Sequence, residues 1–91
     1  MTHRTDAAAK LASSLRTAAR RHRVARKVRD WTITGDRDTA TLDTGKAQIT
    51  VTALADGALT VHYLSPFLEM RGSAASLSAY MDRAAENVAL R

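Results

Sequence analysis

Residues 47–66 read AQITVTALADGALTVHYLSP, and this stretch decides the fold class. Apolar and polar side chains alternate over residues 47–53 and again over 59–63, which is the period of a half-buried β-strand. Asp56-Gly57, between the two runs, is a strong signal for a tight hairpin turn. The stretch therefore predicts an antiparallel hairpin with one apolar face and one face rich in threonine.

Weaker strand signals precede this hairpin. Residues 31–34 and 39–43 are rich in threonine, and each run is followed by a turn signal that contains glycine. Pro66 cannot continue a central strand, so we expect the sheet to end before it. The sequence predicts an antiparallel meander of three or four strands over residues 31–64.

Two helical segments flank this sheet. Residues 6–29 contain neither glycine nor proline, and Thr5 or Asp6 can cap the start of a helix there. Gly72-Ser73 offers a start for a second helix over residues 73–90. The apolar side of that helix carries Ala74, Leu77, Met81, Ala84, Ala85 and Val88, and its outer side Asp82, Arg83, Glu86 and Asn87.

Together these elements predict an α+β fold in one domain, residues 1–91, in the order basic helix, antiparallel meander, C-terminal helix. We expect residues 1–5 to be disordered. A chain of 91 residues builds only a thin core, so we also expect a homodimer or docking on a larger partner. The expected core packs Leu11, Leu15, Leu77, Met81 and Val88 against Ile49, Val51, Leu59 and Val61.

Positive charge is concentrated near the N-terminus. Residues 1–30 hold nine Lys or Arg and two Asp, a net charge of +7, whereas residues 31–91 hold five basic and seven acidic residues, a net charge of −2. No acidic side chain occurs from Ala7 to Arg29. A charge confined to one segment indicates a local electrostatic role.

On a helix of about 100° per residue, four of these cations share one side, opposite the apolar side of the segment. They are Arg16, Arg20, Arg23 and Lys27. Arginine suits phosphate contacts because its planar fork donates to two phosphate oxygens at once. The predicted nucleic-acid-binding residues are Arg16, Arg20, Arg21, Arg23, Arg26, Lys27 and Arg29. No base-reading motif accompanies them, so we expect little sequence specificity.

Other classes of site are not indicated. The chain has no cysteine, and His3, His22 and His62 lack the spacing of metal ligands. His22 falls on the apolar side of the first helix, where a packed or paired histidine is expected. Neither a glycine-rich phosphate loop nor a nucleophile elbow is present. We therefore expect no catalytic residues, no metal and no cofactor, and hence no enzyme.

The chain also lacks a continuous run of roughly 20 apolar residues, which a membrane helix needs. We expect no membrane span and a cytoplasmic location. An arginine-rich amphipathic N-terminus is also compatible with an organelle transit peptide or with a helix lying on anionic lipid.

Residues 47–89 carry a resemblance to a known family, the small nucleoid-associated proteins of the YbaB/EbfC type. The alternating strands of 47–66 with their Asp-Gly turn look like the family's hairpin, and the small and apolar positions of the last helix are similar. The apparent extra hairpin, residues 36–46, departs from the family's pattern. The resemblance implies a long charged helix, a short antiparallel sheet, a homodimer and DNA binding.

We therefore predict a non-enzymatic DNA-binding protein that contacts the phosphate backbone, as a homodimer. The alternative is a small interaction protein, of the kind that phages and mobile elements encode. Such a protein would dock on a larger acidic protein and modulate or inhibit it.

Overall fold

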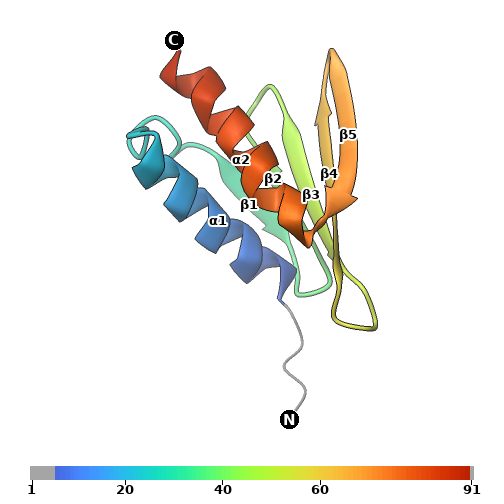
Figure 1. The fold of residues 1–91 in the computed structure, drawn as a ribbon. Helices are drawn as coiled ribbons and strands as arrows, with labels where there is room; N and C mark the ends of the chain where they lie inside the picture. The colour runs from blue at the N-terminus through green and yellow to red at the C-terminus, as the bar shows by residue number, and fades with distance from the viewer. Residues whose placement is uncertain (1–5, 91) are drawn as a thin grey trace.

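The computed structural model describes residues 6–90, so the expectation for residues 1–5 lies outside the described part (Figure 1). The elements follow the order α1 (Ala7–Arg21), β1 (Thr32–Gly35), β2 (Thr39–Asp43), β3 (Gln48–Ala53), β4 (Leu59–Ser65), β5 (Leu68–Ser73) and α2 (Ala74–Ala89). This order confirms the predicted α+β class, with a helix at each end of an antiparallel sheet.

The sheet has five strands in sequence order, and every neighbouring pair is antiparallel. The prediction of three or four strands ending at residue 64 was wrong. Pro66 lies with Phe67 in the two-residue turn that joins β4 to β5, and strand pairing resumes at Ser65 and Leu68. A proline in a turn has no ladder hydrogen bond to lose, so it does not end the sheet.

Both helices cover the same face of the sheet (Figure 1). α1 lies over β1, β2 and β3, and α2 lies over β3, β4 and β5. The apolar residues of the strands point toward them, and one cross-strand row consists of Ile33, Leu42, Ile49, Tyr63 and Met70.

The most completely buried large side chains are Leu11, Leu42, Ile49, Met81, Val51 and Val61. Most of the predicted core is buried as expected, but Leu15 and Val88 are only partly buried at its margin. Burial of this apolar surface between helices and sheet is the main source of stability.

The opposite face of the sheet bears no helix and is polar. One cross-strand row there consists of Thr34, Thr41, Thr50, His62 and Arg71, and a second contains Thr39, Thr52, Thr60 and Ser73. The hydroxyls of Thr41 and Thr50 lie 3.0 Å apart. The predicted threonine-rich face, with His62 on it, is therefore present.

The first helix begins as predicted, because a side-chain oxygen of Asp6 accepts the N–H of Ala9 at 3.2 Å. Its predicted end at residue 29 was wrong, since α1 ends at Arg21. Arg23 adopts a left-handed conformation with φ 58°, and the N–H of Val24 donates to the carbonyl of Ala19 at 2.9 Å.

These contacts form a Schellman motif, which usually has glycine where this chain has arginine. The chain then folds back through residues 22–31, which we call the return segment. Val24 and Val28 are buried there, with 3% and 5% of their surface exposed. Burial of two valines against the core offsets the cost of a left-handed arginine and ends the helix early.

Candidate nucleic-acid interface

The early end of α1 divides the predicted basic residues between two kinds of structure. Arg16 and Arg20 lie on the exposed side of α1. Arg23, Lys27 and the other basic residues of the return segment are exposed on a turn-rich stretch instead. The predicted stripe of four cations along one helix face was therefore wrong, because Arg23 and Lys27 do not continue the helix.

The return segment brings three of the arginines together in a different way. Arg29 comes back beside α1 and lines one groove with Arg16 and Arg20. This groove, which we call the arginine groove, has a volume of about 380 Å³. Its other lining residues are Leu15, Ala19, Ala25, Val28 and Trp31. It is thus a shallow apolar surface with three guanidinium groups around it.

Among residues 6–90, no carboxylate pairs with these three arginines. None of the lining residues is acidic. Within residues 6–90, no ion pair or hydrogen bond engages the side chains of Arg16, Arg20 or Arg29. Three unpaired cations around one apolar surface make a strong local positive potential, which attracts anionic ligands.

Arg21 has a different environment. Its guanidinium lies 2.7 Å from the carboxylate of Asp82 on α2, and the imidazole of His22 lies 3.1 Å from the same carboxylate. The expectation that Asp82 faces outward was therefore wrong, whereas His22 is the paired histidine that we expected. An arginine with a carboxylate partner is a weaker candidate for phosphate contact, so we do not group Arg21 with Arg16, Arg20 and Arg29.

The remaining basic candidates are not part of the arginine groove. Arg23 and Arg26 are exposed on the return segment, and Lys27 lines a separate depression with Asp30 and Asp43. They belong to the same return segment as Arg29, but they do not line the arginine groove. We treat them as assisting contacts.

Trp31 is the site residue that the sequence analysis missed. It lies just outside the basic segment in sequence, yet it lines the arginine groove beside Arg29. Tryptophan offers a broad apolar face for a nucleobase or for the stem of an arginine. The only signal in the sequence was that the single tryptophan directly follows the basic run.

Residues 6–90 contain no group of three or more His, Asp or Glu side chains that could hold a metal ion. No helix in the same range is long and apolar enough to cross a membrane.

A second, larger depression of about 830 Å³ lies at the end of the molecule that carries the β2–β3 and β4–β5 turns. Its lining includes Lys46, Tyr63 and Phe67, and it shares Trp31 with the arginine groove.

The arginine groove is thus a positively charged surface with an apolar floor. No family model matches this chain, and no curated protein and no solved structure is significantly similar to it. The arginine groove is therefore the main evidence on function.

Proposed function

We propose that this protein binds nucleic acid, and duplex DNA above all, by placing the phosphate backbone against the arginine groove. The observation that carries the proposal is the convergence of Arg16, Arg20 and Arg29 on one groove that has no acidic lining residue. The protein would act in the cytoplasm, without catalysis, as a homodimer with little sequence preference.

Phosphate is the anion that best fits three guanidinium groups spaced along a shallow surface. Each guanidinium donates several N–H groups in a plane and pairs with two phosphate oxygens. Binding releases the cations that surround DNA, which makes affinity fall with salt. The lining of the groove holds neither Asn nor Gln, the side chains that pair with adenine edges.

The order helix, antiparallel sheet, helix is also the order of the YbaB/EbfC-type proteins that the sequence resembles. That resemblance supports a homodimer and DNA binding. The five strands of this sheet differ from the short sheet of that family. The arginine groove, and not the resemblance, is thus the main support for the proposal.

A charge-matched pair of variants tests the groove directly. The variant R16Q/R20Q/R29Q removes three positive charges from the groove, and the control R37Q/K46Q/R83Q removes three exposed positive charges elsewhere. Affinity for a labelled duplex of 20 base pairs is measured by fluorescence anisotropy at several salt concentrations. In a dimer, six groove arginines predict a slope of log affinity against log salt near −5 for the unmodified protein.

We expect the groove variant to lose at least tenfold in affinity at low salt and to have a clearly shallower slope. The control variant should lose much less. Equal losses in the two variants would mean that only net charge matters, and unchanged affinity in the groove variant would overturn the proposal. A single-stranded oligonucleotide in the same assay, with Trp31→Leu, measures whether Trp31 stacks on bases.

The alternative is docking on an acidic protein, and one observation favours it. The floor of the arginine groove is apolar, with Leu15, Val28 and Trp31, and a protein helix that combines apolar and acidic residues would fit such a surface. Affinity capture from a lysate treated with nuclease separates the two functions. A defined protein that survives nuclease and is lost in R16Q/R20Q/R29Q supports the alternative.

A further inference from the structure

The sheet ends at β5, which pairs with β4 on one side only. Its six residues, Leu68–Ser73, contain no proline and no lysine, and its two charged residues, Glu69 and Arg71, are of opposite sign, so a suitably placed second strand can pair with both. α2 follows without a loop and packs on the inner face of the sheet, so it does not lie along the outer edge of β5 (Figure 1). The backbone of this edge is open to a further strand.

The side chains of β5 are complementary to those of a second copy. Glu69 and Arg71 flank Met70 and both point to the polar face of the sheet. When two β5 strands pair antiparallel about a twofold axis at Met70, Glu69 lies opposite the partner's Arg71, and Arg71 lies opposite the partner's Glu69. Opposite charges directly across an antiparallel pair stabilise it.

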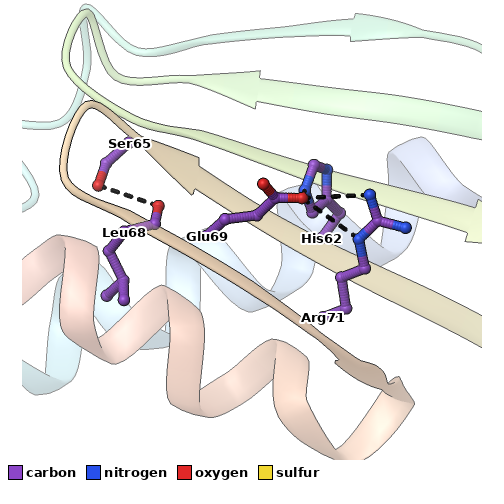
Figure 2. A network of polar contacts seen from close by, with 5 residues as sticks. All are labelled: His62, Ser65, Leu68, Glu69 and Arg71. Carbon is purple, nitrogen blue, oxygen red and sulfur yellow. Dashed lines mark hydrogen bonds and ion pairs between the residues drawn. The ribbon is translucent and has the colours of Figure 1, made fainter.

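Figure 2 shows the carboxylate of Glu69 between His62 and Arg71. Oε1 of Glu69 lies 3.0 Å from Nε2 of His62 and 3.1 Å from Nη2 of Arg71. All of these contacts use Oε1, so within residues 6–90 Oε2 of Glu69 has no partner. Arg71 is also largely free, because 78% of its side-chain surface is exposed. Both groups can therefore take a second partner without breaking the first contact.

The same register suits the other residues of the strand. On the helix-covered face, Leu68 lies opposite the partner's Gly72, whose own α2 covers it with Ser76 and Tyr80. Met70, which is half-buried, lies opposite the partner's Met70. Phe67, in the turn that precedes β5, is 99% exposed in a single chain and lies at the end of the proposed interface.

The other edge strand, β1, also lacks proline and lysine, but it has no pair of opposite charges. β1 has four residues, none of them charged, and it ends in Gly35 with a positive φ. We propose that two copies of this chain pair antiparallel through β5, centred on Met70, to form one continuous ten-stranded sheet. This inference supplies the interface for the homodimer and in that respect rests on the proposed function, but DNA is not needed to form the interface.

Charge reversal and charge exchange test the register. In Glu69→Arg, two arginines face each other at each end of the pair, and in Arg71→Glu two carboxylates do. The exchange variant E69R/R71E restores opposite charges across the twofold axis. The dimer dissociation constant of each protein is measured without DNA by sedimentation velocity at pH 8, with circular dichroism to confirm folding.

We expect each single variant to weaken the dimer at least tenfold and the exchange variant to return to within about threefold of the unmodified protein. An unmodified protein that stays monomeric overturns the proposal, as do single variants that dimerise normally. An exchange variant that is folded but monomeric overturns it as well.

A cross-link provides a second readout that does not depend on charge. The chain has no native cysteine, so Met70→Cys introduces a unique thiol at the proposed axis. Residues directly opposite in an antiparallel pair have Cα atoms about 4.5–5.5 Å apart, which a disulfide spans. Mild oxidation should link two chains of Met70→Cys and leave the control Thr34→Cys, on the β1 edge, largely unlinked. Equal linking of the two variants contradicts pairing through β5.

The outcomes also separate this inference from the proposed function. A β5 dimer without DNA binding overturns the proposed function alone. A monomer that binds DNA with a salt-sensitive affinity overturns the β5 interface alone.

Discussion

Nη1 of Arg21 lies 2.7 Å from Oδ2 and 2.8 Å from Oδ1 of Asp82, so the last turn of α1 is joined to α2. The Nε2 atom of His22 lies 3.1 Å from the same carboxylate. Two groups at the end of one helix therefore share one acceptor on the other. This contact neutralises Arg21, whereas Arg16, Arg20 and Arg29, which line the arginine groove, have no ion pair within residues 6–90.

Replacing Asp82 tests the energetic role of this contact. In Asp82→Asn the side chain keeps its shape but loses the negative charge that attracts Arg21. It also loses one of the two carboxylate oxygens that contact Arg21 and His22. Since the pair is partly exposed, we expect the free energy of unfolding to fall by about 0.5–1 kcal/mol. Urea denaturation at neutral pH measures the change. The control Glu86→Gln removes an exposed carboxylate of the same helix, and an equal loss there would contradict the assignment.

The sequence predicted where α1 begins but not where it ends. Asp6 is a strong capping residue and did cap the helix. No glycine or proline marks the end, and the helical period of apolar residues continues to Val28. The chain nevertheless turns at Arg23, because the turn buries Val24 and Val28 against the core. Tertiary burial decided the boundary, and local sequence carries no signal for it.

The left-handed conformation of Arg23 leads to a second prediction. A side chain in this conformation costs about 1 kcal/mol that glycine does not incur. We expect Arg23→Gly to raise the free energy of unfolding by about 0.5 kcal/mol, in spite of the greater flexibility of glycine when unfolded. Arg26→Gly makes the same change of charge and size at an exposed position without a positive φ, and it should lower stability. Destabilisation by both variants to the same degree would show that the turn is not strained.

Gly35 and Gly45 make a matched pair for the effect of close packing in the turns. Both have a positive φ, 114° and 86°. A Cβ at Gly35 would lie 2.7 Å from the Cα of Ala40 and closer still to the carbonyl oxygen of Thr39, whereas a Cβ at Gly45 would contact nothing within 4 Å. We expect Gly45→Ala to cost about 1 kcal/mol from backbone strain alone and Gly35→Ala about 2 kcal/mol more. Chemical denaturation of the two variants measures the difference, and equal costs would rule out the steric contribution.

The candidate site was predictable in its members but not in its arrangement. Composition alone identified Arg16, Arg20 and Arg29 as candidates, because they lie in a segment without acidic residues. Their convergence with Trp31 depends on the fold-back of the return segment, which a helical projection cannot anticipate. The fifth strand was missed because its sequence signal is weak. Only Leu68 and Met70 alternate with polar residues there, and β5 forms a strand because it pairs with β4.

Acid should weaken the β1–β2 turn through Asp36. Oδ1 of this residue accepts the backbone N–H of Asp38 at 2.9 Å and of Thr39 at 3.1 Å. The N–H of Thr39, and then that of Asp38, hold the pKa of Asp36 below its ordinary value of 3.8. Because the pKa of Asp36 is lower in the folded state than in the unfolded state, the charged carboxylate stabilises the fold at pH values above its ordinary pKa. This stabilisation is lost as the pH falls through the lower, folded pKa.

The variant Asp36→Asn keeps an acceptor oxygen at the same place and cannot ionise. We therefore expect it to melt at a lower temperature than the unmodified protein at pH 7, and we expect this difference to shrink steadily below pH 4. Asp36→Ala also removes the acceptor, so it should melt below Asp36→Asn at every pH, because both turn N–H groups then lose their partner in the fold. Thermal unfolding followed by circular dichroism from pH 2.5 to 7 measures all three proteins. A difference between Asp36→Asn and the unmodified protein that stays constant over this range would show that the charge of Asp36 does not stabilise the turn.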